Sequence, residues 1–222
     1  MLINSKFKTT IIFSTAAIGL VFAATAIAGK NWNNQPKEPL SENEVAGLLY
    51  MREEEKLARD SYIVLFEKWG IPVFDNISQS EQRHMDAMKT LIDRYGLKDP
   101  VQDESVIGGY ENQDLQELFD DLMVMGDISA TYALTVGALI EETDIRDIHH
   151  EIELADHEDI ISTYESLVCG SGNHLRAFVG QLELNGMIYK PEFISEKMYL
   201  EIIGNPVERD CGTSATNGNR PH

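Results

Sequence analysis

Residues 77–95 read ISQSEQRHMDAMKTLIDRY, and this stretch decides the class of fold. Its apolar positions recur at steps of three and four residues, the spacing of one face of an α-helix. We therefore predict a helix from about Asp75 to Tyr95, closed by Gly96, with Glu81 and His84 as the two polar members of its apolar face. The face consists of Ile77, Glu81, His84, Met85, Met88, Leu91, Ile92 and Tyr95.

Glu81 and His84 each allow a functional and a structural interpretation. A Glu and a His three residues apart lie on the same helix face, close enough to bind one metal ion. Alternatively, Ser78 and Glu81 fit a capping box if the helix begins late, and His84 is a buried histidine bonded to a neighbour. The apolar Ile77 one turn earlier favours a helix that is already under way.

Three other long segments have the same helical period, and no segment is typical of a strand. Ser41, with Glu44 three residues later, forms a capping box at the start of the first, and Gly70 and Gly186 end two of them. Short turns pair the segments, and the long connection over residues 97–111 separates the pairs, which predicts an all-α four-helix bundle with one crossover. The predicted long helices are Ser41–Trp69, Asp75–Tyr95, Ile128–Glu153 and Asp156–Asn185, and the short ones are Asp114–Met125 and Pro191–Ile203.

Polar residues interrupt the apolar faces of the other long helices as well. Glu55 lies on such a face in the first helix. Its neighbours Glu53 and Glu54 are most simply interpreted as solvated, and Glu54 is the alternative to Glu55 as the ligand from this helix. The third helix carries Glu141 and Asp144 in an apolar row, with Glu142 as the nearest rival, and the fourth carries His174 at about the same depth. The candidate metal ligands are therefore Glu55, Glu81, His84, Glu141, Asp144 and His174.

This set of side chains has the charge and the donor types of a two-metal site. Ionised carboxylates in an apolar core must be paired, protonated or metal-bound. Four carboxylates would balance two divalent cations, and the mixture of oxygen and nitrogen donors suits iron or manganese better than zinc. The segments 80–88 and 170–178 can also be laid over one another with their histidines matched, which supports a site built from two similar halves.

The overall charge excludes some classes of partner. The 222 residues hold 37 Asp and Glu against 18 Lys and Arg, a formal charge of −19. Without residues 1–28, which contain two lysines and no acid, the charge becomes −21. Because affinity for nucleic acid depends on basic side chains at phosphates, we expect no nucleic-acid partner.

The N-terminus has the layout of an export signal. Lys6 and Lys8 precede an uncharged run, Ile11–Ala28, that ends in Ala-Ile-Ala before Gly29. We interpret residues 1–28 as a signal peptide or an uncleaved anchor and residues 29–39 as a linker, so the protein is expected outside the cytoplasm and at a membrane only if the anchor is kept. In an oxidising compartment Cys169 and Cys211 could pair and tie the tail to a helix.

The motifs quoted above resemble the ferritin-like di-iron superfamily, rubrerythrin-type proteins included, in which one Glu from each of two helices and a Glu-x-x-His from each of two others hold the metals. The likeness is greater still to a ferritin-like family described only as a domain of unknown function. It covers about residues 40–186 and departs from the pattern at Ser171, where the superfamily has a second Glu. We expect Asp144 to replace that glutamate; the alternative, if Asp144 does not reach, is a weak second position and a protein that binds one ion. The matching segments are 53–60, 80–87, 137–142 and 173–178.

The resemblance implies a ferritin-like bundle over residues 40–190, followed by a short C-terminal helix and flexible tail over 191–222, that binds two iron ions, or manganese. It implies a protein that oxidises Fe(II) or reduces dioxygen or peroxide. The alternatives are a metal-sequestering bundle without turnover and a metal-free bundle whose interior polar groups bond each other. The oligomeric state stays open, a homodimer included, and Tyr62 either passes electrons or fills the core.

Acidic and histidine side chains also crowd the turn between the third and fourth long helices. A solvated surface explains such a cluster most simply, and a patch where metal ions enter is the alternative. The cluster consists of His149, His150, Glu151, Asp156, His157 and Glu158.

Overall fold

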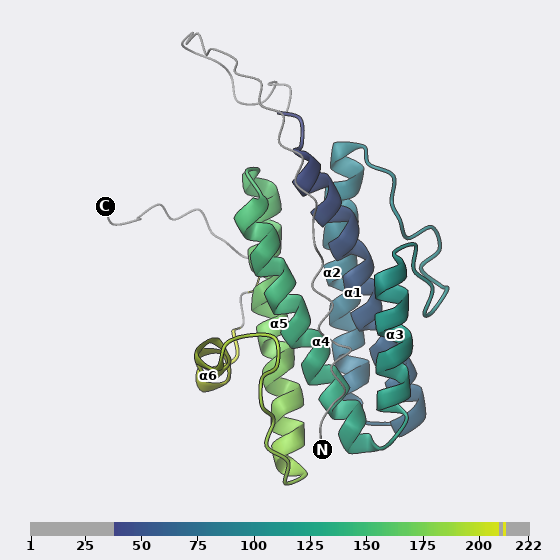
Figure 1. Ribbon diagram of the computed structural model, residues 1–222, viewed down its shortest axis with the longest axis vertical. Coiled ribbons are helices and arrows are strands. Elements are labelled where there is room, and N and C mark those ends of the chain that lie inside the picture. The colour runs from purple at the N-terminus through teal and green to yellow at the C-terminus, as the bar shows by residue number, and fades with distance from the viewer. Residues whose placement is uncertain (1–37, 209–210, 212–222) are drawn as a thin grey trace, which may run out of the picture. The chain divides into compact units, whose positions relative to one another are not determined.

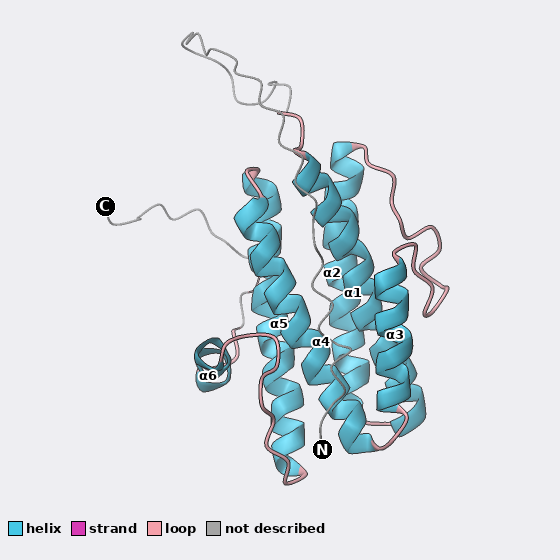
Figure 2. Ribbon diagram, viewed as in Figure 1, coloured by secondary structure: helices cyan, strands magenta, loops and turns pink. Residues whose placement is uncertain are grey.

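The computed structural model describes residues 38–208 and 211, and within that part of the chain every regular element is an α-helix, as predicted (Figure 2). The predicted signal peptide or anchor, nearly all of the linker and most of the predicted tail lie outside the described residues. None of the described helices is both long and apolar enough to cross a membrane. The helices are α1 Glu42–Trp69, α2 Pro72–Tyr95, α3 Gln113–Gly126, α4 Ala130–Leu154, α5 Glu158–Leu184 and α6 Glu196–Gly204.

Local sequence signals set the helix boundaries. The predicted capping box at α1 is present, since the Ser41 hydroxyl accepts from the Glu44 backbone amide and the Glu44 carboxylate accepts from the Ser41 amide at 2.9 Å. Gly70 ends α1 with a φ of 63°, a conformation that favours glycine.

Two predicted helix starts are wrong. Helix α2 begins at Pro72 rather than Asp75, because proline is well suited to the first turn of a helix. Ser78 therefore lies inside α2, and the capping-box interpretation of Glu81 is excluded. Helix α6 begins at Glu196 rather than Pro191, because the Ser195 side chain caps it.

The long helices pack as two pairs, α1 with α2 and α4 with α5 (Figure 1). The pairs meet where α1 contacts α4 and α2 contacts α5, while α3 packs on α1 and α4, and α6 rests on α5. Two apolar clusters fill the bundle, and on α1, α2 and α5 the candidate ligands lie between them. A polar layer therefore divides the apolar core.

Buried cations on α1 hold the long crossover in place. The Arg52 guanidinium binds the Asp99 carboxylate at 3.1 Å, and the Lys56 ammonium donates to the Val106 carbonyl at 2.7 Å. Arg59 donates to the Glu104 carbonyl at 2.7 Å. Because α1 is covered by α2, α3, α4 and this loop, it is buried around its whole circumference near its centre.

Candidate metal centre

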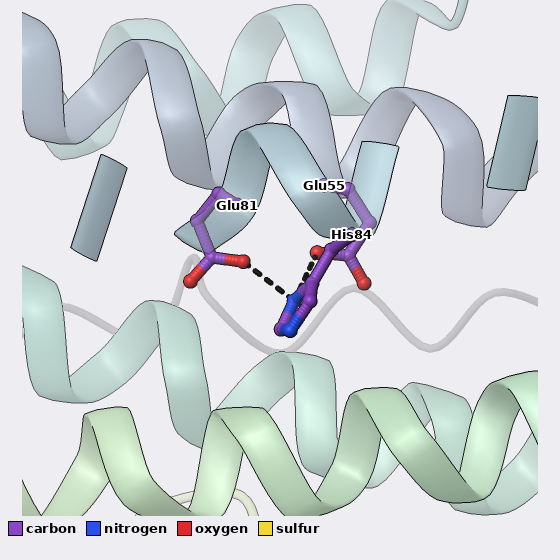
Figure 3. A group of neighbouring side chains, drawn as sticks. All are labelled: Glu55, Glu81 and His84. Atoms are coloured by element: carbon purple, nitrogen blue, oxygen red, sulfur yellow. Dashed lines mark hydrogen bonds and ion pairs between the residues drawn. The ribbon is translucent and has the colours of Figure 1, made fainter. Parts of the chain in front are cut away.

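The polar layer gathers side chains from all four long helices. Glu55 comes from α1, Glu81 and His84 from α2, Glu141 from α4 and His174 from α5. The three glutamates are each 1% exposed. Figure 3 shows Glu55, Glu81 and His84 pointing toward one another, with the His84 ring between the two carboxylates. The inward positions predicted for these five residues are therefore confirmed.

These five residues form two groups of three that share Glu81. One group is Glu55, Glu81 and His84, and the other is Glu81, Glu141 and His174; in each, one ligand atom per residue lies within 4.8 Å of the others. One oxygen of Glu81 lies 2.7 Å from Nδ1 of His84, and its other oxygen lies 2.6 Å from Nδ1 of His174. Glu81 is thus common to both groups, each of which could hold a metal ion.

Several atoms of these groups have unused donor or acceptor capacity. Among the described residues, Oε1 of Glu55, Oε1 of Glu81 and Nδ1 of His174 are buried without a hydrogen bond. The Glu81 and His174 atoms are close but are not aligned as donor and acceptor. Since buried polar atoms are nearly always satisfied, this arrangement fits a metal ion that the lone pairs would share.

The pKa shifts of these groups indicate that a bound cation would replace protons. Burial raises the pKa of Glu55 to about 7, although His84 opposes the shift, and burial with the charge of Glu81 raises the pKa of Glu141 to about 7. Burial would lower the pKa of His174, but Glu81 and Glu141 raise it to about 10. Protons therefore balance the carboxylates where no metal is bound, and metal binding would release them.

Asp144 is buried beside these groups but belongs to neither of them. One of its oxygens accepts a hydrogen bond from the Ser171 hydroxyl, and the other, Oδ1, has no hydrogen bond within the described part of the chain. The serine that departs from the superfamily pattern therefore holds the carboxylate expected to replace the missing one. Ligation by Asp144 stays a prediction.

The rival glutamates have different partners. The Glu142 carboxylate accepts from the Tyr189 hydroxyl at 2.5 Å and from the Ile194 amide at 2.8 Å, so it anchors the C-terminal segment, while its neighbour Glu141 faces the site. Of the pair on α1, Glu55 belongs to one of the two groups that could hold a metal ion, and Glu54 belongs to neither.

The prediction that Glu53 and Glu54 are solvated is wrong. Glu53 accepts from the Asn112 amide at 3.1 Å, and Glu54 is 3% exposed. No sequence signal showed this, because the burial of α1 on every side, its cations included, appears only in the packed structure.

Close packing supports the histidines and Glu141. A Cβ at Gly170 would lie 2.5 Å from Nε2 of His84, so this position needs glycine. The buried Tyr62 hydroxyl donates to Glu141 at 2.5 Å, and its ring packs on Phe178 with centroids 5.1 Å apart.

Some members of the acidic and histidine cluster between α4 and α5 have a structural role. His149 and His150 are exposed as expected. His157 instead bonds through Nδ1 to the buried Glu44 at 2.7 Å, and Glu151 is buried against Gly47.

The tail is joined to α5 by a disulfide between Cys169 and Cys211, whose Cα atoms lie 5.5 Å apart. The pairing that the sequence allowed is therefore present. Asn173, the neighbour of His174, also binds this segment, because its side chain donates to the Glu208 carbonyl at 2.8 Å. The described tail residues thus cover the outer side of the helix that carries His174.

Known proteins resemble the chain over the whole region that forms the site. The family model "Uncharacterized protein domain (DUF2202)" matches residues 44–206. The chain is 49% identical over 174 residues to "Uncharacterized protein MJ0754" of Methanocaldococcus jannaschii, which is 78% of this chain and 94% of that protein. It is also similar to the solved structure "Crystal structure of hypothetical protein MJ0754 from Methanococcus jannaschii DSM 2661", with a TM-score of 0.76 and 48% identity over 79% of this chain and 100% of that one.

Proposed function

The chain belongs to the family of uncharacterized proteins DUF2202, and from this membership and the geometry of the site we propose that it is a ferritin-like protein that binds two iron ions, with manganese as the alternative metal. We propose that it works outside the cytoplasm and oxidises Fe(II) or reduces dioxygen or peroxide. The observation that carries the proposal is the Glu81 carboxylate, whose two oxygens face two different histidines, each in its own group of three ligands.

The proposal assigns the ligands as follows. Glu55 and His84 would hold one ion, Glu141 and His174 would hold the other, and Glu81 belongs to both groups. Bound iron would supply the reversible one-electron chemistry that lets a pair of ions reduce dioxygen or peroxide. Tyr62 donates to Glu141 and so fixes the direction of the other Glu141 oxygen.

Several features support the ferritin-like assignment. Two helix pairs joined by a long crossover, with carboxylates and histidines in the middle of the bundle, are the architecture of that superfamily. The two apolar clusters on either side of the polar layer would exclude water from the ions. Because low polarity strengthens the attraction between ions and carboxylates, this burial favours tight binding.

Two features support the proposed location. The sequence of residues 1–28 has the layout of an export signal. The disulfide between Cys169 and Cys211 is of the kind that persists in oxidising compartments.

The second Glu-x-x-His motif lacks its glutamate, and this favours one further candidate function. With Ser171 in that position, the second ion has fewer protein ligands unless Asp144 moves toward it. This shortage favours a protein that binds the metal without turnover.

Oxygen consumption separates the two candidates. Fe(II) is added anaerobically to the metal-free protein, and oxygen uptake is recorded after air is admitted. We expect uptake well above that of Fe(II) alone for the wild type and for Asp86→Asn, a control on the exposed side of α2, and its loss in Glu81→Gln. Bound iron with uptake no faster than free Fe(II) would instead indicate sequestration.

A further inference from the structure

Glu54 is a buried carboxylate with no hydrogen-bond partner in the described part of the chain. Its side chain is 3% exposed, and neither of its oxygens makes a hydrogen bond. It belongs to neither group of three around Glu81. An unsatisfied buried carboxylate is costly, so a cation or a proton must occupy this position.

The register of α1 against α4 shows what faces Glu54. Tyr62 of α1 bonds Glu141 of α4, and Gly47 of α1 is so close to Glu151 that a Cβ at Gly47 would lie 1.9 Å from the Glu151 carboxylate. The helices are therefore antiparallel, and Glu54, midway between Gly47 and Tyr62, lies opposite the segment 144–147.

The segment of α4 opposite Glu54 carries two acids, Asp144 and Asp147. Asp144 also has an oxygen, Oδ1, without a hydrogen bond among the described residues. The unused oxygens of Glu54 and Asp144 thus lie on facing segments of α1 and α4.

A row of acids on α4 joins this pair to the surface. Glu141, Asp144, Asp147 and Glu151 follow at steps of three and four residues, so they share one face of α4. The Asp147 side chain is 17% exposed and is paired with Arg146 at 2.5 Å. The row therefore leads from a partly exposed carboxylate to Glu141 in the candidate metal centre.

We propose that Glu54 and Asp144 bind a third divalent cation, with Asp147 on its solvent side, and that ions pass through this position toward Glu81. The pair offers only carboxylate oxygens, which suit Mn²⁺, Fe²⁺ or Mg²⁺ and do not select Zn²⁺ or Cu²⁺. With two protein carboxylates and water as ligands, the ion is held more weakly than one that also has a histidine. The role in loading rests on the proposed function, whereas the cation site itself does not.

Anomalous diffraction at the manganese edge tests the site. Crystals of the whole protein soaked in MnCl₂ are compared for the wild type, Glu54→Gln and Glu67→Gln, an exposed change of the same kind on α1. We expect a peak between Glu54 and Asp144 in the wild type and in Glu67→Gln, and its loss in Glu54→Gln with the peaks beside Glu81 retained. Absence of this peak from the wild type, or its persistence in Glu54→Gln, overturns the site.

The rate at which Mn²⁺ fills the positions beside Glu81 tests the role of Glu54 in loading. Mixing with Mn²⁺ should fill the positions beside Glu81 several-fold more slowly in Glu54→Gln than in Glu67→Gln, with the same final occupancy there. Asp147→Asn, a change at the partly exposed end of the row, should slow filling in the same direction if Glu54→Gln does not fold. Equal rates in all variants overturn the loading role. In the diffraction experiment, a manganese peak beside Glu54 with no peak beside Glu81 would contradict the proposed function but would support the third cation site.

Discussion

Three consecutive glutamates on α1 have three different environments. Glu53 binds backbone amides at the start of α3, Glu54 has no hydrogen bond within the described residues, and Glu55 lies beside His84 at 3.2 Å. Only the position of Glu55 was predictable, because it falls on an apolar face. Successive helix positions are turned by about 100°, so three in a row are all buried only where a helix is covered on every side. That covering depends on tertiary packing, which the sequence period does not show.

At the same scale, we predict that the observed position of the His84 ring requires glycine at residue 170. Gly170→Ala places a Cβ 2.5 Å from Nε2 of His84, so the imidazole must move away from Glu55 and Glu81. We expect the bound iron per chain to fall toward half of the wild-type value, because a displaced ligand weakens one of the two positions. Elemental analysis measures this loss. Gly180→Ala on the same helix, where a Cβ meets nothing within 4 Å, should leave the iron content unchanged.

At the scale of elements, carboxylates also join segments that are distant in sequence. Glu44 near the start of α1 accepts from the amides of Asp156 and His157 before α5, and Glu142 of α4 accepts from the segment before α6. The sequence predicted the long helices because their period and their glycine stops are local. It did not predict these connections, since the partner of a single carboxylate is decided by how the helices pack.

The Glu44 connection predicts a pH-dependent stability. Burial would raise the pKa of Glu44, but the hydrogen bonds from Ser41, His157 and Asp156 lower it to about 2. The stabilisation is therefore complete above the ordinary value of 4.5 and is lost as the pH falls toward 2. Glu44→Gln should lower the free energy of unfolding by about 1–3 kcal/mol at pH 7. Urea unfolding should show this difference shrinking at pH 2.5, and the exposed change Glu42→Gln should show neither effect.

The Glu142 connection predicts a loss of stability without a loss of metal. Glu142→Gln removes the charge that accepts from Tyr189, Phe193 and Ile194, which should cost about 1–3 kcal/mol. Thermal unfolding measures the cost, with the exposed change Glu153→Gln on the same helix as the control. If Glu142 were a ligand instead of Glu141, the variant would lose iron as well.

At the scale of the whole molecule, the polar layer divides the core into two apolar clusters. The all-α bundle and its crossover were predictable from helix period and loop length. The sharing of Glu81 between two histidines was not, because it depends on the register of α2 against α5. A bundle with buried carboxylates at its centre is expected to gain stability from any ion that neutralises them.

Metal should therefore raise the melting temperature of the whole chain. An ion present at about 100 times its dissociation constant stabilises the folded state by about 2.7 kcal/mol, which for a protein of this size raises the melting temperature by about 5–10 °C. Calorimetry of the metal-free protein with and without Mn²⁺ measures the rise. The rise should be much smaller in Glu81→Gln and unchanged in Asp86→Asn.

The central claim is that Glu81 bridges two ions, and elemental analysis of protein purified without added metal tests it most directly. After dialysis, the wild type and Asp86→Asn should each retain close to two iron or manganese ions per chain, and Glu81→Gln should retain almost none. Equal metal contents in the wild type and Glu81→Gln, or a wild type free of metal that takes up none when Fe(II) or Mn²⁺ is supplied, would contradict the claim.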